Sequence, residues 1–176
     1  MDFLDVVKNR HSIRSFKKDQ EIPESILNQI LETGIRAPSA GNQQAWDFIL
    51  ITKHEIKKQL VKAALDQDFI AEAPIVIVVC ANQMRSAAVY GKRGKELYSI
   101  QDTAAAIMTM LLTITALGYG ACWVGAFHED LVRSILKIPE ESGIRPVAIL
   151  PLGIPKEIPR PTPRIPLKEL VHHEIW

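Results

Sequence analysis

Apolar side chains recur along this chain at two spacings, and the spacing predicts which segments are helices and which are strands. Intervals of three or four residues predict helices over 2–9, 22–35, 53–64, 100–117 and 130–136. Runs rich in β-branched residues predict strands over 46–52, 75–80, 121–124 and 146–152. The run over 75–80 has no polar alternation, which is typical of a strand buried on both faces. Two helices precede the first strand, so the order predicts an α+β fold rather than a regular doubly wound sheet.

Three segments fit neither spacing. Residues 37–44 have the composition of a loop, and the polar, basic stretch 83–95 predicts a mobile loop or a short helix. Five prolines between 155 and 166 exclude a helix or a central strand and predict an extended arm. A short helix over 167–171 is expected to dock this arm.

The 25 residues from Thr103 to Phe127 contain no Asp, Glu, Lys, Arg or His. A run of this length prompts a transmembrane interpretation. Four threonines and three glycines lie within it and no basic cluster flanks it, so we expect no membrane span. A buried helix followed by a buried strand explains the run, but such a helix has no polar face and must be covered on every side. The run therefore indicates contact with a second subunit.

The composition narrows the class of protein. The chain has 176 residues, of which 47% are hydrophobic and 23% charged, and its formal net charge is +1. These values exclude a disordered or collagen-like chain and predict one folded domain over residues 1–176. The near-neutral balance gives no general attraction to nucleic acid or to acidic membranes, so neither is expected as a partner. Two cysteines and an N-terminus without an apolar signal segment predict a cytoplasmic protein.

Two glycine-containing stretches resemble nucleotide motifs but lack their defining features. Residues 91–96 have too short a glycine spacing for a phosphate loop, and 118–123 follow a helix where a dinucleotide motif would follow a strand. A third stretch, 123–127, ends a predicted strand, where Gly125 allows a flat ligand or another backbone to approach closely. An ordinary turn at a strand end is the alternative.

The turn from Arg10 to Arg14 carries two guanidinium groups and the Ser12 hydroxyl within five residues. Guanidinium groups bind phosphate through paired hydrogen bonds, so the turn suits a phosphate that carries a polyol. A solvated basic turn is the alternative. Arg164 in the proline-rich arm could add a third cation, and the polar side chains of 38–44 could bind amide and carbonyl edges.

We identify no catalytic side chain and no metal site in the sequence. Cys80 and Cys122 lie in apolar predicted strands, where a cysteine acts as a small hydrophobic residue. The adjacent residues His172, His173 and Glu174 point in different directions, which favours a solvated tail over a metal cluster.

Several segments together resemble the nitroreductase family of flavin-dependent NAD(P)H oxidoreductases. They are RHSIRSF at 10–16, APSAGNQQAW at 37–46, EAPIVIVVCA at 72–81, the long segment 100–127, PVAILPLGIP at 146–155 and PRIPL at 163–167. The match covers nearly the whole chain, and the order of the segments is specific. The resemblance implies a mixed β-sheet flanked by helices, an intertwined homodimer, and one FMN per subunit at the two interfaces.

The resemblance also implies a set of FMN-binding residues. Arg10, His11, Ser12 and Arg14 would hold the phosphate and the ribityl chain. Pro38, Ser39, Ala40 and Asn42 would come from the partner subunit and line the flavin. Trp123, Val124, Gly125 and Ala126 would run along the isoalloxazine ring. Arg164 would close on the phosphate from the arm of about 155–176, which is expected to pack on the partner. Gln67 would contact the pyrimidine edge. Ala45 stands where the family usually has proline, which leaves the rigidity of the loop open.

The implied chemistry needs no nucleophile, because the cofactor carries it. Electrons would pass from NAD(P)H through flavin N5 to nitroaromatic, quinone or similar electron-poor acceptors, and the segment 83–96 would cover the substrate. Two alternatives share the scaffold: a specialised flavin reaction such as reductive dehalogenation or flavin cleavage, and a non-catalytic flavin-binding or redox-sensing module.

Overall fold

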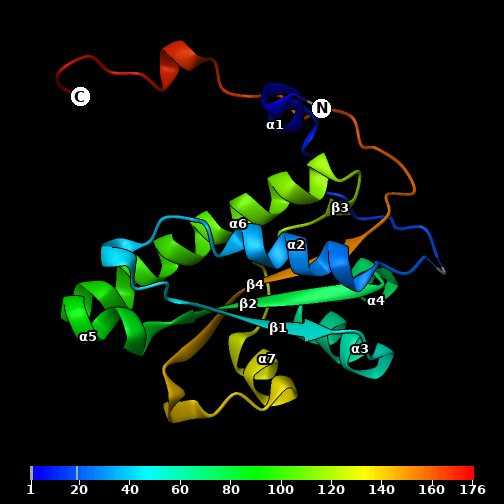
Figure 1. Cartoon of the computed structure of the whole chain (residues 1–176), viewed down its shortest axis with the longest axis horizontal. Helices are drawn as coiled ribbons and strands as arrows, with labels where there is room; N and C mark the ends of the chain where they lie inside the picture. The colour runs from blue at the N-terminus through cyan, green and yellow to red at the C-terminus, as the bar shows by residue number, and fades with distance from the viewer. Residues whose placement is uncertain (1, 19) are drawn as a thin grey trace.

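A four-stranded sheet lies between two layers of helices in the computed structural model, which describes residues 2–18 and 20–176 (Figure 1). The helices are α1 (Phe3–Asn9), α2 (Glu24–Gly34), α3 (His54–Ala63), α4 (Phe69–Glu72), α5 (Gln83–Arg93), α6 (Ser99–Ala116) and α7 (Glu129–Leu136). The short helical turns are η1 (Ala40–Asn42), the π-helix η2 (Gly94–Tyr98), η3 (Glu140–Ser142) and η4 (Leu167–Glu169). The strands are β1 (Trp46–Ile51), β2 (Ile75–Asn82), β3 (Gly120–Ala121) and β4 (Ile144–Gly153).

The strands lie in the order β1-β2-β4-β3, and each neighbouring pair is antiparallel. Among the described residues, parallel pairing is limited to one isolated bridge between Ser12 and Ala121. An antiparallel sheet with helices confirms the α+β prediction, whereas the mixed sheet that the resemblance implies is antiparallel at each of these strand pairs. The sheet has β1 at one edge and β3 at the other, which decides below where the parts of the site lie.

Two apolar clusters hold the layers together, one on each face of the sheet. Residues of β2 alternate between them: Ile77 packs with α2 and α6, whereas Val76 and Val78 pack with α3, α4 and α7. Every residue of β2 from Ile75 to Ala81 is buried, as the unbroken apolar run predicts. Figure 1 shows α2 and α6 on one side of the sheet and α3 and α7 on the other.

The structure decides one open alternative and differs from the sequence predictions at three places. Of the loop and the helix predicted for 83–95, the chain forms the helix, α5, which begins where the Asn82 side chain accepts a hydrogen bond from the Arg85 N–H, bends at Gly91 and continues through η2 into α6. The strand expected over 121–124 is shorter, because only 120–121 form β3 and Val124 makes an isolated bridge to Ile149. The final helix is the three-residue turn η4, and α4 was not predicted.

The helix α6, in which Asp102 is the one charged residue, is buried most fully on its inner face. Its inner face, which includes Ile107, Met110 and Ile114, is fully buried against the sheet. Its outer face is less covered, and Met108 is 39% exposed there. The continuous helical segment 83–116 is long and apolar enough to cross a membrane, but 44% of its apolar window is already buried in this fold.

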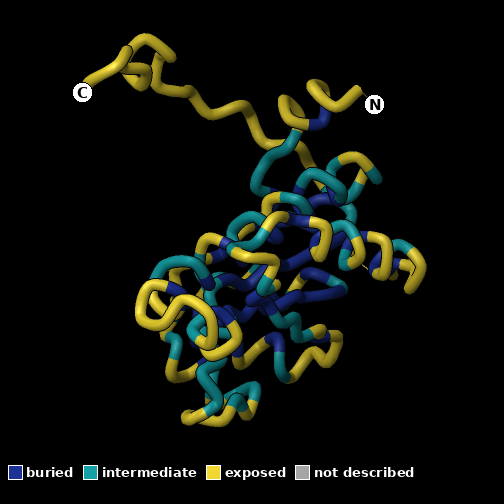
Figure 2. Tube along the Cα trace, turned by 60° about the vertical axis from the view of Figure 1, so that its left-hand side comes forward, coloured by how far each residue is buried: buried dark blue, intermediate teal, exposed yellow. Residues whose placement is uncertain are grey.

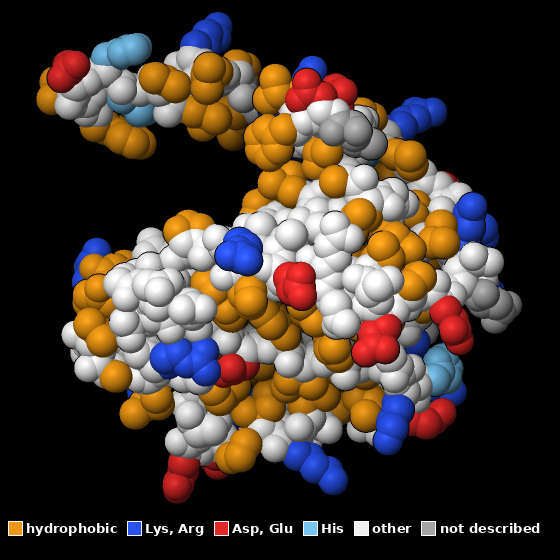
Figure 3. All heavy atoms as spheres, in the orientation of Figure 1, with side chains coloured by type: hydrophobic (Ala, Val, Ile, Leu, Met, Phe, Trp, Pro, Cys, Tyr) orange, Lys and Arg blue, Asp and Glu red, His pale blue; other side chains and the backbone are white. Residues whose placement is uncertain are grey.

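The C-terminal segment leaves the body after Lys156, whose N–H donates to the Ser15 carbonyl. From 156 to the last residue every side chain is exposed, and the segment runs clear of the body (Figure 2). Apolar side chains gather on it (Figure 3) and include Ile158, Ile165, Leu167, Leu170, Val171, Ile175 and Trp176. The segment 156–176, which includes η4, is thus exposed along its whole length among the described residues.

Candidate functional site

The basic turn after α1 is held against the edge strand β3. Ser12 bridges Ala121, and the Ile13 N–H donates to the Ala121 carbonyl at 2.9 Å. The approach needs a glycine in β3, because a Cβ on Gly120 would lie 2.5 Å from Cγ1 of Ile13. Ile13 is buried, so the chain direction leaves the neighbouring Arg14 side chain exposed.

Three side chains of this turn lie near the thiol of Cys122. Burial raises the pKa of that thiol, whereas Arg14, Ser12 and Arg10 act in the opposite direction. The guanidinium carbon of Arg14 also lies 6.0 Å from the centre of the Phe69 ring. Within the described part of the chain, neither arginine makes an ion pair. The cluster thus presents uncompensated positive charge and a hydroxyl.

The strip 123–126 continues from this cluster along the edge of the sheet. Val124 is buried and exchanges backbone hydrogen bonds of 2.9 Å with Ile149, so its neighbours face outward. Trp123 is 40% exposed. A Cβ on Gly125 would meet nothing closer than the Trp123 indole nitrogen at 4.0 Å, so the space above this backbone is open. The strip is a flat, exposed backbone edge.

Gln67 joins the strip from the loop before α4. Its side-chain amide donates to the Ala126 carbonyl at 3.2 Å and to the Ala64 carbonyl at 2.9 Å. The turn, Gln67 and the strip therefore lie close to one another in this chain. Phe69 is a further member that sequence reasoning missed, since a single aromatic residue in a short helix has no distinctive pattern.

A small cavity of about 220 Å³ adjoins the strip at Gly125. Its wall includes Phe127 and the ion pair between Glu129 and Arg145, whose closest nitrogen and oxygen are 2.7 Å apart. The hydrogen bonds from Arg145 hold the pKa of the Glu129 carboxyl below its usual range. His11 lines a different cavity, of about 360 Å³, near the end of α6.

A larger cavity, about 640 Å³, lies apart from these residues. It is lined by Lys57, whose ammonium group already donates to the carbonyls of Ala73 at 2.6 Å and Pro74 at 3.3 Å. Burial lowers the pKa of this lysine. Its cation compensates the carbonyl groups at the end of α4, which is a structural role.

The loop with Pro38, Ser39, Ala40 and Asn42 is not part of this surface. It leads into β1 at one edge of the sheet, whereas the strip follows β3 at the other edge. The Ala40 N–H donates to a carboxylate oxygen of Asp102 at 2.9 Å, in the first turn of α6. Three strand spacings, about 14 Å, separate the two edges. Within one chain the loop and the strip therefore lie at opposite edges of the sheet.

Arg164 is also distant from the turn in this chain. It lies in the exposed arm, and its guanidinium group donates to the carbonyls of Thr162 at 3.0 Å and Pro163 at 3.2 Å. One chain thus assembles Arg10, Ser12, Arg14, Gln67 and the strip, but not the loop or Arg164.

The assembled groups fit a flat molecule with an anionic end. Two free guanidinium groups and a hydroxyl match phosphate or carboxylate oxygens. The open backbone at Gly125 admits a planar ring, and its N–H and C=O groups can bind polar ring atoms.

The sequence model of the Nitroreductase family matches residues 7–67 and 61–154, which contain every part of this surface. The chain belongs to the Nitroreductase family. This confirms the family resemblance and places the turn and the strip of this nitroreductase-family chain inside the matched region.

Individual relatives agree with the family assignment. An NADH dehydrogenase of Thermus thermophilus is 29% identical over 97% of this chain and 95% of its own length. An FMN reductase (NADPH) of Bacillus subtilis is 25% identical over 97% of this chain and 72% of its own length. The crystal structure of a nitroreductase family protein from Clostridium novyi is 32% identical and superimposes with a TM-score of 0.80 over 89% of this chain and 87% of that chain.

Proposed function

We propose that this chain is an FMN-dependent oxidoreductase that transfers electrons from NAD(P)H to small electron-poor acceptors such as nitroaromatic compounds and quinones. The observation that carries the proposal is the meeting of the free cations Arg10 and Arg14 with the open strip 123–126 on one surface. The family assignment and the names of the relatives, an NADH dehydrogenase and an FMN reductase, support the same chemistry.

The residues of the turn would bind the phosphate end of FMN. Arg10 and Arg14 would neutralise the phosphate charge and donate paired hydrogen bonds, and Ser12 would donate its hydroxyl. The resemblance implies that His11 would flank the ribityl chain, whereas in this chain His11 lines the separate cavity near the end of α6. Because Cys122 is buried beneath these groups, it supplies an apolar floor rather than a contact for solvent.

The strip would bind the ring end. Backbone groups of Val124, Gly125 and Ala126 would lie along the ring edge, and Gln67 would contact the pyrimidine edge. Bound FMN supplies the redox chemistry, since it accepts a hydride from the nicotinamide and passes electrons to the acceptor. The chain itself orients the ring and tunes its surroundings by fixed dipoles.

No side chain of this chain is required as a nucleophile. The two cysteines are buried, and burial raises the pKa of Cys80 to about 12, so its thiol remains protonated. Two buried free thiols also suit a reducing compartment, and we place the protein in the cytoplasm.

A homodimer would complete the site. The loop 38–42 and the strip of its own chain lie at opposite edges of the sheet, and the partner subunit's loop would line the flavin. The arm of about 155–176 would wrap the partner and bring Arg164 to the phosphate. The half-covered outer face of α6 and the apolar arm supply the surface that such a dimer would bury. We expect a contact area well above about 2,000 Å².

The direct test is an anaerobic absorbance spectrum of the purified protein reconstituted with FMN, before and after NADH or NADPH. Loss of the flavin absorbance band on adding a nicotinamide, and its return with a quinone, would support the proposal. Bound flavin that neither nicotinamide reduces would favour a binding or sensing module. Loss of the flavin itself would favour flavin cleavage. Failure to bind FMN would overturn the proposal.

A further inference from the structure

We propose that Asp102 and Arg85 are positioning residues that hold the loop 39–46 in the shape with which it completes the FMN site of the partner subunit. This inference rests on the proposed function. Neither residue touches the candidate surface of its own chain, and each would act on the partner's site only through the loop.

The loop has a backbone that does not hold its shape unaided. Gly41, Asn42 and Gln44 have φ values of +53°, +56° and +51°, all in the left-handed region. Glycine and asparagine adopt this region readily, but glutamine does so at an energetic cost. A segment of this kind keeps one conformation only where its surroundings fix it.

Asp102 fixes the loop from the side of α6. Its carboxylate is 4% exposed and accepts the Ala40 N–H at 2.9 Å through Oδ1. Burial raises the pKa of this carboxyl, and the N–H groups of Ala40 and Ala45 counteract that rise. The second oxygen, Oδ2, is buried without a hydrogen-bond partner among the described residues. A buried acid is unfavourable for stability, which indicates that its contact with the loop has another use.

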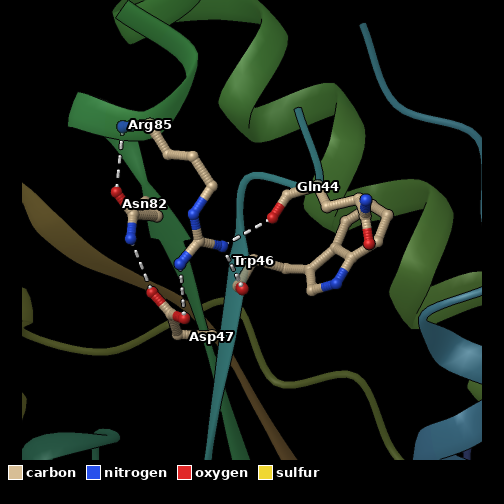
Figure 4. A network of polar contacts seen from close by, with 5 residues as sticks. All are labelled: Gln44, Trp46, Asp47, Asn82 and Arg85. Atoms are coloured by element: carbon tan, nitrogen blue, oxygen red, sulfur yellow. Dashed lines mark hydrogen bonds and ion pairs between the residues drawn. The ribbon is translucent and has the colours of Figure 1, made fainter. Parts of the chain in front are cut away.

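Arg85 fixes the loop from the side of α5 (Figure 4). One guanidinium nitrogen donates to the carbonyls of Gln44 at 2.6 Å and Trp46 at 3.0 Å, the two residues that flank Ala45. The other nitrogen pairs with Asp47 at 3.1 Å, and the Asn82 amide holds the second oxygen of Asp47 at 2.9 Å. The guanidinium therefore restrains the backbone at the position where alanine replaces the rigid proline.

Two packing contacts complete the arrangement. The Ser39 hydroxyl accepts the Gln44 N–H at 2.9 Å, which closes the loop on itself. A Cβ on Gly41 would lie 2.2 Å from the Tyr90 hydroxyl, so α5 packs directly on the loop. The loop is restrained on both sides before any ligand arrives, and such preorganisation lowers the cost of binding.

The first test measures FMN affinity by quenching of flavin fluorescence. Asp102→Ala and Arg85→Gln are each expected to weaken binding about tenfold or more, because each removes charge-assisted hydrogen bonds to the loop. Asp102→Asn and Arg85→Lys keep part of the contacts and should recover part of the affinity. Arg93→Gln is the matched control, since Arg93 lies on the same helix and donates to Tyr98 rather than to the loop. It should bind FMN like the wild type.

The second test asks whether Asp102 and the loop that it holds act on the FMN site of their own subunit or on that of the partner. In a mixed dimer of an Arg14→Ala subunit and an Asp102→Ala subunit, the Asp102→Ala subunit keeps its own turn and receives an intact loop. One site should then bind FMN with wild-type affinity. In the reference dimer, both substitutions lie on one subunit and the other is wild type, so no site should bind normally. Substituting Asp102→Asn for Asp102→Ala covers the case in which the alanine variant does not fold.

The outcomes separate the two proposals. If the wild-type protein binds no FMN, the proposed function is overturned. If the wild-type protein binds FMN and every variant of Asp102 and Arg85 binds it with the wild-type affinity, the positioning role of these two residues is overturned. If the reference dimer binds normally at one site and the complementing dimer does not, the loop acts within its own subunit and the inference is wrong.

Discussion

The turn 10–14 and the loop 38–46 are predicted to serve the same ligand, yet they lie at opposite edges of one sheet. The turn is joined to its half of the site within the chain, through the bridge from Ser12 to Ala121. The loop is also held by hydrogen bonds, with Asp102 and Arg85, but at the edge of the sheet opposite to the strip. A fold that holds a loop rigidly and away from its own site has the form of one half of a two-subunit site. The idea of a two-subunit site can be tested by separating the subunits or by weakening either the turn or the loop.

Removal of residues 158–176 is expected to have the largest effect. It deletes the seven exposed apolar side chains of the arm, and burial of even two of them is worth about 3 kcal/mol, or at least about 100-fold in the dimer dissociation constant. Sedimentation equilibrium would measure the change, with circular dichroism as the check that the body folds. A truncated chain that dimerises as tightly as the full chain would show that the arm is dispensable.

Arg14→Ala removes one free cation from the turn. We expect FMN to bind about 10- to 100-fold more weakly, because a charge-assisted contact to phosphate is lost. Isothermal titration with FMN would measure the affinity. Lys8→Ala on the exposed face of α1 is the control and should bind normally. Unchanged flavin content in the Arg14 variant would contradict the phosphate site.

Asn42→Gly changes the other half of the site more gently. Glycine keeps the φ of +56° at this position and removes only the side chain, so the loop should retain its shape. A loss of about threefold to tenfold in FMN affinity is expected, as for one neutral hydrogen bond. A loss as large as that from Arg14→Ala would mean that the loop contributes as much as the cations.

Glu129→Gln should have the smallest effect, and it depends on pH. Arg145 holds the pKa of Glu129 below the usual range, so the carboxylate favours the folded state at neutral pH. That contribution is lost as the pH falls through the lowered pKa. At neutral pH the free energy of unfolding of the wild type should exceed that of the variant by about 1 kcal/mol or less, because the ion pair is partly exposed. This difference should disappear in acid. The measurement is thermal unfolding at several pH values, and Glu32→Gln, on the exposed side of α2, is the control that should show no such dependence. A stability difference for Glu129→Gln that stays constant with pH would contradict the ion pair with Arg145.

The spacing of apolar residues predicted most of the fold, because burial determines it directly. The buried run at 75–80 could only be a central strand, and the helix from about 100 to 117 followed from its length. For the segment 83–95 the sequence left a loop and a short helix as alternatives, since its helix depends on a cap from Asn82 and a bend at Gly91 that composition does not show.

The site was less accessible to sequence reasoning. The turn and the strip are more than a hundred residues apart, and only the family resemblance joined them before the structure did. Asp102 and Arg85 were missed because a single acid or arginine has no pattern. One signal was present for Asp102: it is the last charged residue before the 25 uncharged positions that follow.

The central claim, that two subunits build each flavin site, is tested most directly by sedimentation velocity with detection at the flavin absorbance band. The protein is diluted through its dimer dissociation range at a fixed excess of FMN. We predict that flavin sediments with the dimer, at one FMN per subunit, and leaves the protein as monomers form. Flavin that sediments with the monomer at full occupancy would contradict the account.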